Sequence, residues 1–250
     1  MKILLTNDDG IDSAGLTALA SSLSGQHELY VVAPRSQRSA SAHAITVHSQ
    51  IEFDKQPSKY SDNCYAVSGT PADCVKLAAL FLFKDRLPDL VIAGINDGSN
   101  LGCDTIYSGT VSAALEAAYM KLRGIAVSLY SHADGCTDAG FGLAADFIKN
   151  NLDELLSLDV DARSVLNINH PDGESAGKIV TKLAYNYYSD YYAIDKQYPN
   201  RVQLRGRPNG HSDTDTDVSW AERNYITVTP VTLDKNDYAS LGRIKGYKFR

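Results

Sequence analysis

Two adjacent carboxylates lie near the start of the chain, directly after a short apolar stretch. Lys2–Thr6 has the composition of a buried strand, and it is followed by Asn7, Asp8, Asp9 and Gly10. Adjacent like charges repel unless a cation lies between them, although Asn, Asp and Gly also form ordinary solvated turns. On these residues alone both interpretations stay open. The segment has neither the glycine spacing of a dinucleotide-binding loop nor that of a P-loop.

Further oxygen donors follow two other strand-like stretches. Ser39 lies in a loop with two arginines after residues 28–33, and Asn96 lies in a glycine-rich loop after residues 90–93. The six histidines are scattered along the chain, which contains no Cys/His ligand cluster. Carboxylate, hydroxyl and amide oxygens are ligands that favour Mg²⁺ or Mn²⁺ over zinc.

A third group of polar residues begins a helix-forming stretch. Ser108, Gly109 and Thr110 precede residues 111–120, which are rich in Ala, Leu and Glu. Backbone N–H groups at a helix N-terminus, with hydroxyls beside them, bind phosphate well. Simple capping by Ser108 or Thr110 is the alternative, and capping and phosphate binding are compatible. The sequence therefore predicts an anion site at this turn.

The elements that must position these residues alternate between strand and helix over the first 170 residues. This alternation predicts an α/β fold, a Rossmann-like three-layer sandwich with a mostly parallel sheet. Ligands bind such sheets outside the carboxyl ends of the strands, where the residues above are expected to meet. Strands are expected at 2–6, 28–33, 65–68, 90–93, 125–129, 165–168 and 225–228, extended chain at 45–53, and helices at 13–23, 70–83, 111–120 and 141–150.

The pattern weakens after residue 171. Residues 185–192 contain five tyrosines, and two polar stretches follow at 195–201 and 205–217. Tyrosine is enriched at subunit interfaces, although an ordinary hairpin packed on its own domain would also fit. We expect a catalytic core at 1–171 and an extended C-terminal oligomerisation region at 172–250 that returns to the core.

Composition excludes several classes of protein. The chain has 250 residues with 24 Lys+Arg against 30 Asp+Glu, and a net charge of −6 disfavours binding to long nucleic acid. The longest apolar run, residues 77–83, is far shorter than the roughly 20 residues that span a membrane. Four widely spaced cysteines and the absence of a secretory leader at the start predict a reduced, cytoplasmic protein.

The sequence resembles the stationary-phase survival protein SurE family of metal-dependent nucleoside-monophosphate phosphatases. The matching segments occur in family order from residue 1 to about residue 234. They are MKILLTNDDGIDSAG, APRSQRSASAHAIT, SGTPADCVKLA, PDLVIAGINDGSNLG, YSGTVSAALEAAY, LNINHP and ITVTPVTLD.

The resemblance implies a divalent-metal-dependent 5′-nucleotidase that acts on nucleoside 5′-monophosphates, with 3′-monophosphates as a further candidate substrate. It implies one Mg²⁺ or Mn²⁺ per subunit and a homodimer or homotetramer that exchanges C-terminal elements. Its implied residues are Asp8, Asp9 and Asn96 for catalysis, Asp8, Asp9, Ser39 and Asn96 for the metal, and Asn7, Ser108, Gly109 and Thr110 for phosphate or substrate.

The chemical step leaves alternatives open. We expect Asp8 to orient or deprotonate the attacking water, and a covalent aspartyl-phosphate is the alternative within the same class. Two other functions compete with a mononucleotide phosphatase. One is a short-chain exopolyphosphatase or nuclease that uses the same metal site, and the other is a non-catalytic nucleotide-binding regulatory protein.

Overall fold

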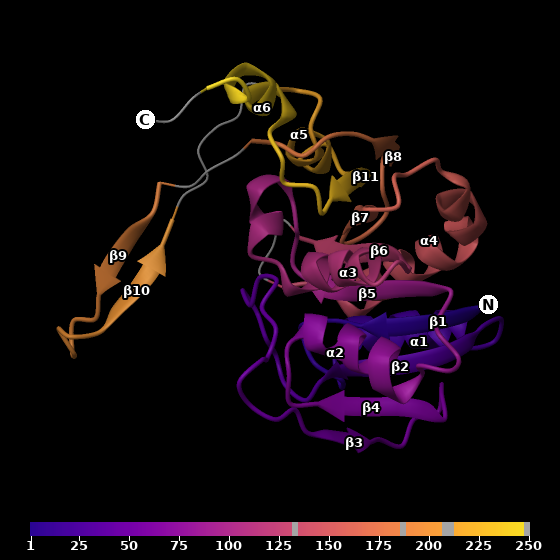
Figure 1. Ribbon diagram of the computed structural model, residues 1–250. Helices are drawn as coiled ribbons and strands as arrows, with labels where there is room; N and C mark the ends of the chain where they lie inside the picture. The colour runs from indigo at the N-terminus through magenta and orange to yellow at the C-terminus, as the bar shows by residue number, and fades with distance from the viewer. Residues whose placement is uncertain (132–134, 186–188, 207–212, 248–250) are drawn as a thin grey trace.

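The computed structural model describes residues 1–131, 135–185, 189–206 and 213–247. Its centre is a nine-stranded sheet with strands in the order β3-β4-β2-β1-β5-β6-β7-β11-β8 (Figure 1). Only the β3–β4 and β7–β11 pairs are antiparallel, which confirms the prediction of a mostly parallel sheet. In that order the strands are Phe53–Lys55, Asn63–Val67, Glu28–Pro34, Lys2–Thr6, Leu90–Asp97, Arg123–Tyr130, Ser164–Pro171, Tyr225–Thr232 and Gly177–Val180.

Helices cover both faces of this sheet, as the three-layer prediction requires. On one face, α1 (Ala14–Leu23) and α4 (Asp138–Ser157) pack Leu19 and Ile148 against a core that includes Leu5 of β1. On the other face lie α2 (Pro71–Leu77), continued by a π-helical turn (Ala78–Leu82), and α3 (Gly109–Tyr119). Residues of β1 alternate between the two cores, because successive side chains of a strand point to opposite faces.

Two stretches differ from the sequence prediction. Residues 45–53 were expected to be extended, but only Phe53 of that stretch belongs to a strand, β3. Side-chain contacts hold the rest, such as the Thr46 hydroxyl, which donates to Asp73 at 2.7 Å. Strand β5 is also longer than expected and runs to Asp97, with a register shift against β6 between Ala93 and Asn96. Asn96 therefore lies at the irregular end of a strand and not in the loop beyond it.

The C-terminal residues divide between the sheet and two outlying elements. Strands β8 and β11 join the main sheet, whereas β9 (Tyr191–Ile194) and β10 (Val202–Arg205) form a separate antiparallel hairpin that projects from the body (Figure 1). Helix α6 (Tyr238–Ile244) has no buried residue, and α5 (Asp217–Ala221) precedes β11. Parts of the tyrosine-rich and polar stretches, residues 186–188 and 207–212, lie outside the described residues.

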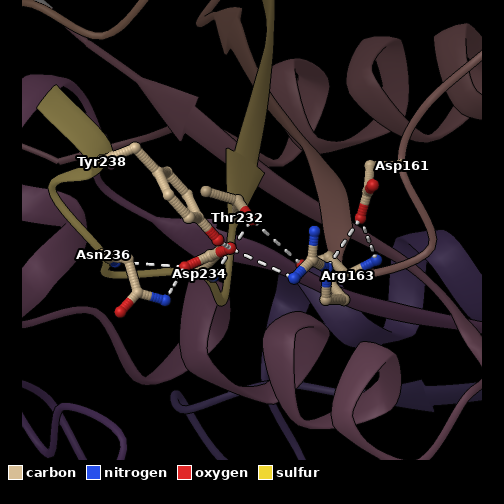
Figure 2. A network of polar contacts seen from close by, with 6 residues as sticks. All are labelled: Asp161, Arg163, Thr232, Asp234, Asn236 and Tyr238. Atoms are coloured by element: carbon tan, nitrogen blue, oxygen red, sulfur yellow. Dashed lines mark hydrogen bonds and ion pairs between the residues drawn. The ribbon is translucent and has the colours of Figure 1, made fainter. Parts of the chain in front are cut away.

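A polar network fastens the end of β11 to the start of β7 (Figure 2). Arg163 pairs with Asp161 at 3.3 Å and with Asp234 at 3.1 Å. Asp234 also accepts hydrogen bonds from the backbone N–H of Asn236 and from the Tyr238 hydroxyl. The two strands are therefore joined at their ends as well as along their antiparallel pairing.

None of the helices in the described part of the chain is both long enough and apolar enough to serve as a transmembrane span.

Candidate active site

The site lies at the carboxyl ends of β1 and β5, where the chain switches direction along the sheet. Strand β1 pairs with β2 on one side and β5 on the other. The turn after β1 is held by the fully buried amide of Asn7, whose Nδ2 donates to Gly10 O at 3.0 Å and to Ser13 Oγ at 2.6 Å. Its Oδ1 accepts from Gly10 N at 3.1 Å. Asn7 therefore shapes the turn that presents the two aspartates.

Asp8 is directed toward the first turn of α3. Its Oδ1 accepts a hydrogen bond of 2.6 Å from the Thr110 hydroxyl, and the carboxylate also receives backbone N–H donation from Gly109 and Thr110. Burial nevertheless raises the pKa of Asp8 above its ordinary value, because these donors only partly replace lost hydration. Asp8 is thus a buried carboxylate with increased basicity.

Asp9 has a different environment. Burial, and to a lesser degree the neighbouring charges of Asp8 and Asp97, raise its pKa to about 6. The backbone N–H of Asp97 donates to Asp9 Oδ2 at 3.0 Å, and Gln37 Nε2 lies 3.5 Å from Asp9 Oδ1. Asp9 therefore joins the end of β5 to the turn after β1, although the two lie far apart in the sequence.

An open pocket of about 260 Å³ brings half of the predicted site residues together. Asp8, Ser39, Asn96 and Ser108 line it, from four separate segments of the chain. Asn96 Nδ2 donates to Gly98 O at 2.7 Å, which leaves its Oδ1 without a donor among the described residues. The other predicted residues, Asn7, Asp9, Gly109 and Thr110, are not among the residues that line this pocket.

Ser108 both lines the pocket and caps α3. Its hydroxyl oxygen accepts the N–H of Val111 at 3.0 Å, as expected for a helix N-cap. The next two residues direct their polar groups to Asp8, so the phosphate site expected at 108–110 shares its donors with that carboxylate. No sequence pattern indicates this sharing, because Asp8 and Thr110 are 102 residues apart.

Replacing Ser108 by Ala should lower kcat/KM about tenfold, less than the roughly hundred- to thousandfold loss of a complete oxyanion donor, because the helix N–H groups remain. Phosphate release from several mononucleotides measures this effect. Thr137→Ala removes the corresponding cap of α4 away from the pocket and controls for lost capping alone. Equal kinetics for Ser108→Ala and wild type would place the phosphate elsewhere.

Five further residues line the pocket that we did not predict from the sequence. They are Ala40, Asp97, Asn100, Asp104 and Tyr107. Asn100 is buried and its Nδ2 donates to Ser128 Oγ at 2.7 Å, while its carbonyl oxygen accepts from Asn167 and Asn169. Asn96 lies at the end of β5 and Asn100 in the segment that follows, so the close spacing of these two asparagines was an available signal.

The donor set fits a hard divalent cation. Asp8 and Asp9 are adjacent, both have raised pKa values because of burial, and neither forms a salt bridge within the described residues. The part of the chain that the structure describes has no cluster of three or more His, Cys, Asp or Glu side chains. A cation here would instead combine carboxylates with neutral oxygens from Ser39 and Asn96, a set suited to Mg²⁺ or Mn²⁺.

The three-layer fold, with an oxygen-lined pocket at the carboxyl edge of parallel strands, defines a Rossmann-like α/β enzyme. The family model described as "Survival protein SurE" matches residues 3–190. The chain belongs to the survival protein SurE family.

Similar proteins cover nearly all of the chain. A protein named 5′-nucleotidase SurE from Desulforudis audaxviator is 42% identical over 261 residues, covering 98% of this chain and 96% of the relative. The protein of the same name from Natranaerobius thermophilus is 38% identical over 265 residues, covering 100% and 99%. The crystal structure of the SurE protein from Aquifex aeolicus superposes with a TM-score of 0.83 at 31% identity and 98% coverage of both chains.

Proposed function

We propose that this protein is a divalent-metal-dependent phosphomonoesterase that hydrolyses nucleoside 5′-monophosphates to nucleoside and phosphate. The observation that carries the proposal is the pocket that gathers Asp8, Ser39, Asn96 and Ser108 at the β1–β5 switch. The relatives named 5′-nucleotidase SurE support the substrate class, because they align over nearly the full chain. The same pocket chemistry would also accept 3′-monophosphates.

The proposed cation ligands are Asp8, Asp9, Ser39 and Asn96, with one Mg²⁺ or Mn²⁺ per subunit. A divalent cation bound there supplies polarisation of a phosphoryl oxygen and lowers the pKa of a water molecule. The protein contributes the fixed orientation of its ligands, which the Asn7 turn and the Asp9–Asp97 contact hold in place. Asn7 therefore positions the aspartates, and a contact of Asn7 with the substrate belongs to this proposal as well.

Asp8 is the proposed base. Its raised pKa makes it a better proton acceptor, and its Thr110 and α3 N–H contacts fix its orientation toward the attacking water. Ser108 and the positive end of α3 stabilise negative charge that develops on the phosphoryl oxygens. No Lys, Arg or His lines the described pocket, so we assign protonation of the leaving oxygen to solvent water.

A substrate panel tests the proposal. Phosphate release from mononucleotides, a short oligonucleotide and polyphosphate should be measured with Mn²⁺ present. Asp8, Asp97 and Asp104 line the pocket and disfavour a long polyanion, so mononucleotides should be turned over fastest. Faster release from polyphosphate or the oligonucleotide would identify the competing enzyme classes, and binding of mononucleotide without turnover would identify a regulatory protein.

The second part of the proposal is that the protein is a homodimer or homotetramer. The β9–β10 hairpin exposes more than half of the surface of each of its large apolar side chains: Tyr191, Tyr192, Ile194, Val202 and Leu204. An isolated two-stranded hairpin is marginally stable in water, and α6 likewise buries none of its own residues. The division into a core at 1–171 and an oligomerisation region at 172–250 belongs to this proposal, as does a cytoplasmic location.

Light scattering on the full chain should give a mass of at least two subunits at micromolar concentration. Replacing Ile194 and Leu204 with Ser should shift the mass toward the monomer, because both side chains are exposed on the hairpin. Replacing the exposed Val47 with Ser is the matched control. A monomeric wild type would contradict the assembly.

A further inference from the structure

The segment at residues 41–46 forms no helix or strand, yet it is held at several points against the helices beside the pocket. The backbone N–H of Ala42 donates to the carbonyl oxygen of Tyr107 at 3.0 Å. Thr46 donates to Asp73 from its N–H at 2.9 Å and from its hydroxyl at 2.7 Å. The Thr70 hydroxyl donates to Ala44 O at 2.7 Å. The segment is thus attached to the starts of both α2 and α3.

The contact at the middle of the segment is an ion-pair arrangement around Glu116. This carboxylate lies inside α3 with 4% of its surface exposed. His43 Nε2 lies 2.8 Å from one carboxylate oxygen, and Lys76 Nζ of α2 lies 2.6 Å from the other. Burial alone would raise the pKa of Glu116, but hydrogen bonds and charges from His43 and Lys76 more than reverse this, so the carboxyl stays ionised.

A buried ion pair contributes little to the net stability of a fold. Desolvation of the charges offsets much of their attraction, and apolar residues of similar size often serve equally well in a core. The neighbours of Glu116 on α3 are small and fully buried, such as Ala113 and Ala117. What Glu116 provides beyond packing is a directional contact with the 41–46 segment.

That segment leads directly into the pocket wall. Ser39, which lines the pocket, lies two residues before Ser41. The buried Ser41 hydroxyl has no partner within the described chain, and a Cβ built on Gly109 would lie 2.8 Å from both this hydroxyl and Asp8 Oδ2. A displacement of the segment would therefore change the spacing between Ser39, Asp8 and the first turn of α3.

We propose that Glu116 and His43 are positioning residues for the phosphatase reaction. Their contact holds the 41–46 segment on α3 and so keeps Ser39 opposite Asp8 and the Ser108–Thr110 turn. The inference rests on the proposed function and deepens it, because it assigns residues outside the pocket to assembly of the site. Neither side chain touches the substrate.

This role has a kinetic signature. If the segment is detached in part of the molecules, substrate and cation bind only to the remaining, assembled molecules. The apparent dissociation constants of substrate and cation then rise in inverse proportion to the fraction of assembled molecules. Saturating ligand restores the assembled form, so kcat stays close to the wild-type value. A group that acted on the reacting atoms would lower kcat instead.

The test compares His43→Ala, His43→Gln and wild type. KM for a nucleoside 5′-monophosphate should rise about tenfold in His43→Ala, within the range typical of coupling between sites. The Kd for Mn²⁺, measured by calorimetry without substrate, should rise similarly. His43→Gln retains a donor that can reach Glu116 and should recover most of both losses. His48→Ala is the matched control, because His48 is exposed and makes no hydrogen bond or ion pair in the described structure.

A second pair of variants separates the role of the segment from that of the helix pair. Glu116→Leu should reproduce the KM and Kd changes, and combining it with His43→Ala should add little, because both remove the contact between His43 and residue 116. Lys76→Met loses the ion pair between α2 and α3 but not the segment contact, and should change the melting temperature more than KM.

The outcomes are distinguishable. Wild-type KM and Mn²⁺ affinity in a folded His43→Ala protein would overturn the inference, and so would a loss of kcat with unchanged KM. Additive effects of His43→Ala and Glu116→Leu would also overturn it. Absence of phosphate release from the wild type would contradict the proposed function, and the Mn²⁺ titrations would then decide the positioning inference alone.

Discussion

Replacing Asp8 with Asn should reduce kcat/KM by about ten-thousandfold, the upper end of the range for loss of a general base, because a cation ligand is lost with it. Asn keeps the size of the side chain and one oxygen, which can still accept from the Thr110 hydroxyl. It removes the charge and the proton-accepting group. Phosphate release from a mononucleotide measures this loss, and Asp12→Asn, an exposed change in the same turn region, is the control.

The same variant should separate catalysis from stability. Without metal, Asp8 is a buried anion beside Asp9, and burial raises the pKa of both groups, so removal of one charge should leave Tm equal or slightly higher. In the wild type, metal at a hundredfold excess over Kd stabilises the fold by about 2.7 kcal/mol, which corresponds to roughly 5–10 °C for a chain of this size. That shift should shrink or vanish in Asp8→Asn. A much lower metal-free Tm of Asp8→Asn would mean that the role of Asp8 is mainly structural.

Gly109→Ala should lower kcat/KM by at least about a hundredfold, because a displacement of about 1 Å at a reacting group has an effect of this size. The new Cβ would lie 2.8 Å from Asp8 Cβ, Asp8 Oδ2 and Ser41 Oγ, which real Cβ atoms essentially never do. Asp8 must therefore move away from the start of α3. Steady-state kinetics measure the loss, and thermal melts should show a cost of about 1–3 kcal/mol from overpacking.

Gly142→Ala provides the matched control for this change. Gly142 lies inside α4, and a Cβ there would meet nothing within 4 Å. Alanine at this position should leave kcat/KM unchanged and stabilise the fold by about 0.5–1 kcal/mol, as expected for Gly to Ala in a helix. Wild-type activity in Gly109→Ala would mean that the Asp8 position in the structure is not the one used in the reaction.

The main features of the fold were predictable because they depend on local pattern. Strand β1 has the predicted bounds Lys2–Thr6, and α1 begins one residue after the predicted position 13, because Ser13 caps it. The pocket residues Asp8, Asn96 and Ser108 were found because each follows or ends a strand or begins a helix at one edge of a parallel sheet. A role in ligand binding or catalysis can be inferred from sequence for residues at such positions once the order of strands and helices is known.

Other features depend on contacts between distant segments. Nothing in the sequence indicates that Thr110 donates to Asp8 or that His43 meets Glu116, because these pairs are separated by 102 and 73 positions. Residues 45–53 looked extended because of their apolar and β-branched composition, but only Phe53 belongs to a strand, and Thr46 forms hydrogen bonds with Asp73 instead. Asn7 is predicted to contact substrate, and the structure adds that both polar atoms of its side chain form hydrogen bonds within the turn, a detail that only the packed loop reveals.

The most direct test of the proposed function is phosphate release from a nucleoside 5′-monophosphate by wild-type protein stripped of metal with a chelator and then titrated with Mn²⁺. We predict negligible release in the stripped protein and a saturable rise with Mn²⁺ that Asp8→Asn does not show. Release that is independent of added metal, or no release from any mononucleotide at saturating Mn²⁺, would contradict the proposed function.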